Sequence, residues 1–169
     1  MNARMSDLLE GFELHAREED VPDQFRAVVR AGWTADGDAQ LLTALHSGYS
    51  GGGRQDFEDV IHYEASVNGR GMMDYDLPGS GPERLDTLLR RCLGYACTVL
   101  DSVAEGQKCP VRSYVSLSEG GLDDDLLTAH VTFCSDHPDL PRYVDDLDAY
   151  GQEALLELSQ DDAAALLVR

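Results

Sequence analysis

Two runs of alternating residues, 111–118 and 127–134, constrain the fold of this chain more than any other feature. In a β-strand successive side chains point to opposite faces, so each run predicts a strand with one buried and one exposed face. The residues expected to face inward are Val111, Ser113, Val115 and Leu117, then Leu127, Ala129, Val131 and Phe133. Between the runs, EGGLDDD (119–125) combines two glycines with three aspartates and predicts a solvent-exposed hairpin connection.

A similar alternation predicts another hairpin at residues 60–77. In VIHYEASVN (60–68) the odd-numbered positions from Ile61 are apolar, and the even-numbered positions are polar. A turn signal, Asn68-Gly-Arg-Gly71, follows, and MMDYDL (72–77) alternates again. This pattern places His62 and Glu64 together on a polar sheet face.

Helical spacing dominates residues 83–105. Apolar residues recur there at steps of three and four, which predicts an amphipathic helix that ends at Gly106 and packs on the sheet. Its inward stripe is Leu85, Leu88, Leu89, Cys92, Ala96, Val99 and Val103, and its outer side carries Arg84, Arg90, Arg91 and Asp101.

The remaining segments complete the predicted architecture. Residues 5–47 read as short helices, 48–56 as a glycine-rich loop, and the part from Leu140 onward has mixed helical periodicity. We therefore predict an α+β protein, a two-layer sandwich whose mainly antiparallel four-stranded sheet is made of two hairpins, with helices packed on one face. A length of 169 residues predicts a single domain, 1–169, with an N-terminal helical part (about 5–47) and an α+β part (about 58–169).

The chain is strongly acidic. Asp and Glu total 32 against 13 Lys and Arg, which gives a formal net charge of −19. Such a charge repels nucleic-acid phosphates and anionic lipids and attracts basic proteins. Genome composition or adaptation to salt is an alternative source of this acidity. The N-terminus lacks an apolar export signal, and no apolar run is long enough to span a bilayer, so we expect a cytoplasmic protein.

Metal and cofactor sites have weak support in the sequence. The aspartates of 123–125 are consecutive, whereas calcium loops place oxygen ligands at alternating positions. In HVTFCSDH (130–137), His130, Cys134 and His137, with His62 as a further ligand, are spaced too loosely for a typical zinc site. The four cysteines form no C-x-x-C pair and are expected to be reduced thiols. We expect neither a metal nor a cofactor.

Two hypotheses on function remain. The leading one is a small acidic binding protein that engages, and can inhibit, a basic partner protein, in the manner of immunity proteins and antitoxins; it predicts no binding to nucleic acid or membrane. Its docking residues are predicted to be Asp123, Asp124, Asp125, Asp145, Asp146 and Asp148.

The alternative is a small enzyme or ligand-binding protein. Its acid–base residues are predicted to be His62, Glu64, Tyr114 and His130, gathered on the polar face of the sheet. The chain contains no G-x-S-x-G, G-x-x-x-x-G-K-[ST] or H-E-x-x-H motif. We therefore expect a binding protein rather than an enzyme.

Overall fold

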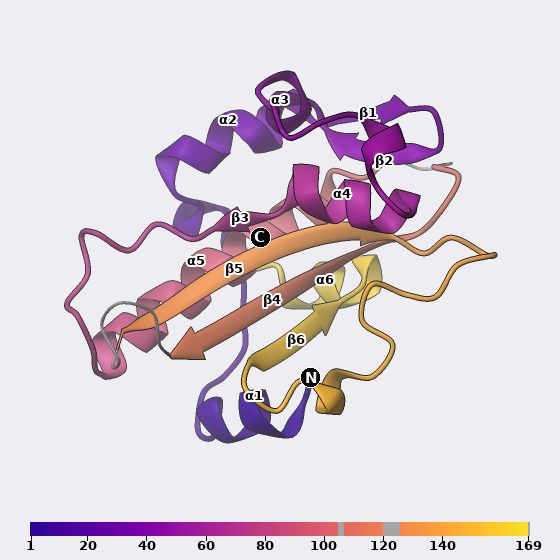
Figure 1. The fold of residues 1–169 in the computed structure, drawn as a ribbon. Coiled ribbons are helices and arrows are strands. Elements are labelled where there is room, and N and C mark those ends of the chain that lie inside the picture. Colours follow the sequence, from indigo (N-terminus) through magenta and orange to yellow (C-terminus); the bar gives the residue numbers. More distant parts are fainter. Residues whose placement is uncertain (105–106, 120–125, 169) are drawn as a thin grey trace.

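The computed structural model describes residues 1–104, 107–119 and 126–168. Within them, four strands form an antiparallel sheet in the order β3-β5-β4-β6, and two further strands form a small antiparallel sheet. The α+β class and the four-stranded antiparallel sheet predicted from the sequence are confirmed (Figure 1). The strands are β1 (Trp33–Asp36), β2 (Ala39–Leu42), β3 (Arg70–Gly71), β4 (Val111–Glu119), β5 (Leu127–Ser135) and β6 (Ala154–Leu158). The α-helices are α1 (Ala3–Leu8), α2 (Asp23–Ala31), α3 (Thr43–Ser47), α4 (Val60–Asn68), α5 (Pro82–Asp101) and α6 (Gln160–Leu166).

The hairpin predicted from the alternating runs is present as β4 and β5. Its register runs from Val111 opposite Ser135 to Glu119 opposite Leu127. The inward residues of both strands, among them Val115, Val131 and Phe133, belong to the main hydrophobic core. The connection at 120–125 lies outside the described residues.

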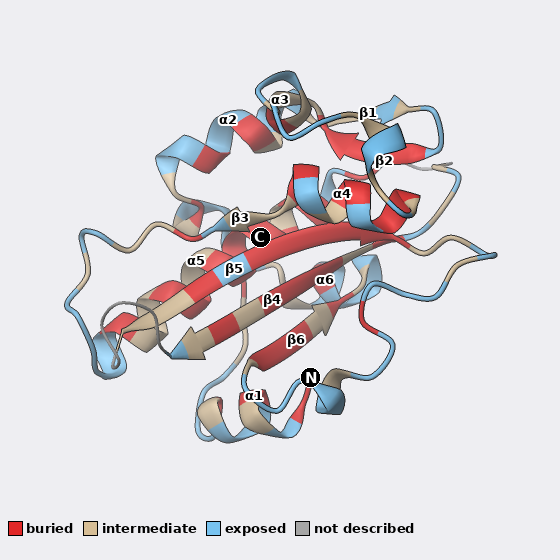
Figure 2. Ribbon diagram, viewed as in Figure 1, coloured by how far each residue is buried: buried red, intermediate tan, exposed pale blue. Residues whose placement is uncertain are grey.

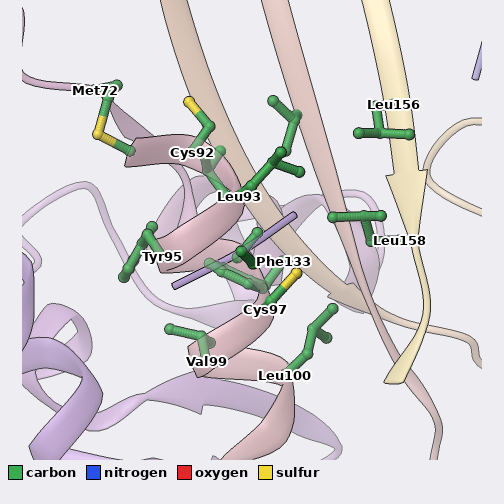
Figure 3. Packing of buried hydrophobic residues seen from close by; sticks show 14 of the residues in the cluster. Met72, Cys92, Leu93, Tyr95, Cys97, Val99, Leu100, Phe133, Leu156 and Leu158 are labelled. Carbon is green, nitrogen blue, oxygen red and sulfur yellow. The ribbon is translucent and has the colours of Figure 1, made fainter. Parts of the chain in front are cut away.

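Helix α5 covers one face of this sheet. Pro82 occupies its first turn, where a missing backbone N–H costs nothing. The predicted stripe of Leu88, Cys92, Ala96 and Val99 is buried, and Figure 3 shows Cys92 and Val99 in the cluster that also holds Phe133 and Leu156 and Leu158 of β6.

One residue of the expected outer side of α5 is buried instead. Arg84 is 2% exposed; its guanidinium donates to the carbonyls of Leu127 (2.7 Å) and Pro78 (3.0 Å) and pairs with Asp74. Because a buried guanidinium requires acceptors, Arg84 ties the segment before α5 to the start of β5.

The hairpin predicted at 60–77 is wrong, because residues 60–68 form helix α4. Asp59 begins this helix by accepting a hydrogen bond from the backbone N–H of His62. Helix α4 packs on the sheet face opposite α5, where Ile61 and Tyr63 share a second hydrophobic cluster with Tyr114 and Cys134. Both faces are therefore covered near the end of β5, and residues 131–135 are all buried (Figure 2).

The helical reading of the N-terminal part holds only in places. Helix α2 ends at Gly32 as predicted. Residues 33–42, however, form the β1–β2 hairpin, which turns at Gly37 with a φ of 63°. Short 3₁₀ segments occur at Glu18–Asp20, Arg54–Asp56 and Leu147–Ala149. Among the described helices, none has the length and apolar character needed to cross a membrane.

The C-terminal part contains a strand that the sequence reading missed. β6 pairs with β4 and forms one edge of the sheet. Asn2 covers this edge: its backbone N–H donates to the carbonyl of Leu155, and its side-chain oxygen accepts from the N–H of Leu155, both at 3.0 Å. The side-chain amide of Asn2 also donates to the carbonyls of Leu147, Tyr150 and Glu153. Asn2 thus joins the start of the chain to its last strand.

Candidate functional site

A hollow lies on the part of the sheet face that α4 leaves uncovered. It has a volume of about 570 Å³ and is bounded by β4, β5, the first turn of α4 and the segment 143–155. We call it the tyrosine–histidine hollow, and its lining residues are His62, Tyr114, Ser116, Ser118, His130, Thr132, Tyr143, Val144, Tyr150, Glu153 and Leu155. Its volume is within the range of small-molecule and side-chain recognition sites, about 300–1,000 Å³.

The hairpin register explains how β4 and β5 supply the floor. Tyr114 lies opposite Thr132, and Ser116 lies opposite His130, so their side chains share the outer face of the sheet. This part of the outer face is accessible to solvent, since His130 is exposed while its neighbours Ala129 and Val131 are buried on the α5 side. The same alternation that buries one face of the hairpin therefore presents this polar floor.

Aromatic rings form steep walls around the floor. The rings of Tyr114 and Tyr143 have centroids 5.4 Å apart and an interplanar angle of 62°. The rings of His62 and Tyr143 are 6.4 Å apart at 72°. Tyr143 is 37% and Tyr150 46% exposed, so both present ring surface to solvent. Tyr114 is only 4% exposed, so the solvent-accessible tyrosine rings of the recess are those of Tyr143 and Tyr150.

The lining has almost no formal charge. Among the described residues that line it, Glu153 is the single carboxylate, and neither lysine nor arginine contributes. Partial burial and nearby Arg70 lower the pKa of His130, which favours its neutral form at pH 7. Burial raises the pKa of both Tyr114 and Tyr143, so both phenols are protonated. The recess is therefore neutral to slightly negative.

His62 is held at the edge of the hollow by Asp59. The ring Nδ1 of His62 and Oδ1 of Asp59 are 2.8 Å apart, and the same oxygen accepts the backbone N–H of His62. Burial acts to raise the pKa of Asp59, but the hydrogen bonds and the electrostatic interaction with His62 outweigh it, and the pKa is lowered. Asp59 is thus an ionised helix cap that also orients the imidazole.

The predicted acid–base group is assembled only in part. His62, Tyr114 and His130 do line one hollow, but Glu64 does not, because it lies two residues from His62 on a helix rather than on a strand. Its side chain is completely buried, with Oε1 accepting from the N–H of Gln40 and Oε2 from the N–H of Ser135, both at 2.7 Å. The assignment of Glu64 to the polar sheet face is wrong.

The predicted acidic docking residues fall into two groups. Asp123, Asp124 and Asp125 lie outside the described residues. Asp145, Asp146 and Asp148 are exposed in the segment that carries Tyr143 and Tyr150. Their carboxylates accept backbone N–H groups, from Arg142 to Asp145, from Asp148 to Asp146 and from Ala3 to Asp148. Asp145 and Asp146 therefore fix local turns, Asp148 holds the backbone of Ala3, and all three remain on the surface beside the hollow.

Sequence reasoning missed Tyr143, Tyr150 and Glu153 as parts of the site. Tyr143 and Tyr150 were read with Leu147 as a helical stripe, because their spacing is four and three. Pro138 and Pro141, with the aspartates around them, were the available signal that this segment is irregular.

The residues of HVTFCSDH diverge in the structure. His130 lies in the hollow, the thiol of Cys134 is 3.9 Å from the carbonyl of Ile61 under α4, and His137 lies beside Glu64. Over residues 1–104, 107–119 and 126–168, no three histidine, cysteine or acidic side chains are grouped so as to hold a metal ion.

Comparisons with models of protein families, with curated proteins and with solved structures found no match.

Proposed function

We propose that this chain is an acidic binding protein that engages a basic partner protein and that the tyrosine–histidine hollow receives a lysine or arginine side chain of that partner. The observation that supports this most directly is the combination, in one recess, of aromatic walls with a lining free of lysine and arginine. The four unpaired cysteines fit a reducing compartment, and we propose the cytoplasm.

A cation fits this recess because the faces of aromatic rings carry negative electrostatic potential. A lysine or arginine over such a face gains about 0.5–2 kcal/mol, with larger values where water is excluded. Tyr143 and Tyr150 both line the hollow and are 37% and 46% exposed, so an inserted cation has accessible aromatic surface to contact. Glu153 adds a carboxylate at the same site. Tyrosine also combines a large apolar surface with a hydroxyl, which suits a binding surface.

The surroundings of the hollow support rapid capture of a basic protein. Asp145, Asp146 and Asp148 are exposed next to Tyr143 and Tyr150, on a molecule with a formal net charge of −19. Such a field steers cationic partners toward the surface and accelerates association, with a strong dependence on salt. A partner whose own active surface is basic, such as a nuclease, would be inhibited when this surface is covered.

A small-ligand protein or enzyme is the second candidate, because His62, Tyr114 and His130 do meet in a cavity of about 570 Å³. The position of Glu64 is evidence against an enzyme, because this predicted acid–base residue is buried and accepts hydrogen bonds from backbone N–H groups instead of lining the hollow. A neutral small molecule that binds the hollow with no dependence on ionic strength would favour this second candidate.

The test uses a fluorescent arginine-containing peptide and its citrulline counterpart, which has nearly the same shape without the charge. We expect the arginine peptide to bind, and Tyr143→Ala or Tyr150→Ala to weaken it about two- to thirtyfold, the equivalent of the cation–aromatic energy. Tyr75→Ala is the matched control, because Tyr75 is 78% exposed and lies outside the hollow. All three variants keep the net charge, so generalised attraction is held constant.

Association kinetics test the acidic surface separately. Replacing Asp145, Asp146 and Asp148 together by Asn keeps the acceptor oxygens that fix the turns. We expect slower association at low ionic strength and little difference at high ionic strength, where charges are screened. Equal losses for Tyr75→Ala and Tyr143→Ala, or equal affinity for the citrulline peptide, would refute the proposal.

A further inference from the structure

A thiol, an imidazole and a carboxylate stand in a row at the end of the β4–β5 hairpin, away from the tyrosine–histidine hollow lining. Cys109 precedes β4 and His137 follows β5, two residues beyond the paired Val111 and Ser135. The N–H of Asp136 donates to the carbonyl of Pro110 at 2.8 Å and keeps the two chain segments together there. The register therefore places Cys109 opposite His137, with the thiol 3.8 Å from the ring Nδ1.

The other ring nitrogen of His137 faces a fixed carboxylate. Its Nε2 is 3.5 Å from Oε1 of Glu64, whose side chain is completely buried. Glu64 cannot rotate freely, because both oxygens accept backbone N–H groups at 2.7 Å. Nε2 makes no hydrogen bond to the described residues, so its contact with Glu64 is electrostatic. The carboxylate favours a proton on Nε2, which leaves Nδ1 to accept the proton of the thiol. Nucleophile, base and orienting acid are the three parts of an activated nucleophile.

Cys109 differs from the other cysteines in its access to solvent. Cys92, Cys97 and Cys134 are buried, whereas Cys109 is partly exposed. Burial raises the pKa of the Cys109 thiol, and the negative charges nearby act in the same direction, against Lys108. The thiol is therefore protonated at neutral pH, and its reaction depends on a base that removes the proton during attack. Glu64, Asp136, Asp38 and Lys108 act on the thiol, and Asp136 and Asp38 are themselves paired with Arg112 (2.6 Å) and Arg54 (3.7 Å).

We propose that Cys109 is a modification site that undergoes thiol–disulfide exchange with small cationic disulfides, with His137 as its base and Glu64 as the residue that positions His137. The sulfur of Cys109 attacks one sulfur of the disulfide and passes its proton to Nδ1 of His137. A new S–S bond forms to Cys109 as the S–S bond of the small molecule breaks, and the departing thiolate takes the proton from the imidazolium. Cys109 is oxidised to a mixed disulfide, and the small disulfide is reduced to one thiol and one bound half.

The preference for positive charge follows from the formal net charge of −19, because a strongly acidic protein attracts a cationic reagent and repels an anionic one. Close to the sulfur, Asp136 and Asp38 are paired with Arg112 and Arg54 and add little to this attraction. This site is separate from the hollow. A failure of the exchange reaction would therefore leave the proposed binding of a basic partner untouched, and the reverse also holds.

The experiment compares three disulfides at equal concentration with the intact protein: cystamine (cationic), hydroxyethyl disulfide (neutral) and glutathione disulfide (anionic). Mass spectrometry gives the number of adducts, their position and the rate. We expect one adduct per native chain, at Cys109, formed about tenfold or more faster with cystamine than with glutathione disulfide at low salt. Cys109→Ser should abolish it. Adducts at the buried cysteines, or a faster reaction with the anionic disulfide, would overturn the proposal.

The role of His137 is tested by its pH profile. We expect His137→Gln to slow the cystamine reaction about tenfold or more at pH 7, as for loss of a general base, and to remove the rise in rate at neutral pH. His15→Gln is the matched control, since the ring of His15 contacts only the nearby carbonyl of Glu13 among the contacts described and lies far from Cys109 in the sequence. The profile of the parent protein gives a second measurement that needs no variant. A parent rate that rises only in the alkaline range, where the thiol itself ionises, would refute the assignment of His137.

Discussion

Glu64 shows how a single buried side chain can hold three segments of this chain in place. It projects from α4, accepts the N–H of Gln40 from β2 and the N–H of Ser135 from β5, and faces His137. Burial raises the pKa of Glu64, although the hydrogen bonds and His137 act in the opposite direction. The two backbone donors would be unpaired without it, and an unpaired buried donor costs about 1–3 kcal/mol.

We therefore expect Glu64→Gln to lower the free energy of unfolding by about 1–3 kcal/mol, although the two side chains have nearly the same shape. The amide of glutamine carries one acceptor oxygen, so one of the two N–H groups would meet another donor. Urea unfolding measures the change, and the exposed Glu58→Gln is the control. A variant as stable as the parent would mean that the cost of burying the carboxylate equals the value of its hydrogen bonds.

Glu64 also marks where sequence reasoning about the site failed. On a strand, residues two apart such as His62 and Glu64 share a face. On a helix each residue is rotated by about 100° from the one before, so residues two apart lie on nearly opposite sides. Tyr114 and His130 were correctly placed together because the β4–β5 alternation was read correctly. The contribution of Tyr143 and Tyr150 depends on the tertiary position of an irregular segment, which no local periodicity encodes.

At the scale of elements, the outcome depended on how many sides of each segment are buried. β4 and β5 bury one side over residues 115–119 and 127–131, so a period of two was visible there, and the buried residues of α5 recur at steps of three and four. α4 is buried on most sides, including the polar Glu64 and Asn68, and its apolar residues therefore fit a strand as well as a helix. The β1–β2 hairpin was missed although Asp36-Gly37 is a typical turn signal.

The close contact between α5 and the segment 17–20 requires a glycine. A Cβ added at Gly94 would lie 2.7 Å from the carbonyl oxygen of Arg17 and 3.2 Å from the Cβ of Asp20. Backbone cannot yield as a long side chain does, so the two elements would have to separate. The glycine persists in the middle of a helix for this reason, despite a cost of about 1 kcal/mol relative to alanine.

We expect Gly94→Ala to destabilise the protein by about 1–3 kcal/mol, because overpacking outweighs the gain in helix propensity. Thermal unfolding by circular dichroism measures it. Gly151→Ala serves as the control, since a Cβ at Gly151 meets nothing within 4 Å. An increase in stability for Gly94→Ala would show that α5 and residues 17–20 separate at little cost.

At the scale of the whole molecule, the acidic excess cannot be neutralised internally. Arg84, Arg91 and Arg112 already pair with carboxylates, and Asp and Glu outnumber Lys and Arg by 32 to 13. Composition alone predicted this field. Composition did not predict which part of the surface has little charge. The nearly neutral lining of the hollow comes from the outer residues of β4 and β5 together with Tyr143 and Tyr150.

The hydrogen bonds of Asn2 have a consequence for the order in which the protein assembles as it leaves the ribosome. Asn2 is made well before its partners, because its side chain bonds to the carbonyls of Leu147, Tyr150 and Glu153, the last of these 151 positions later. Its place beside β6 does not exist until that strand has emerged. We expect a chain arrested on the ribosome after Tyr150 to be cleaved by protease within residues 1–9, while the released full chain resists cleavage there. Protection of the arrested chain would show that α1 docks without β6. Asn2 can therefore dock only after the residues 145 to 151 positions later have been made.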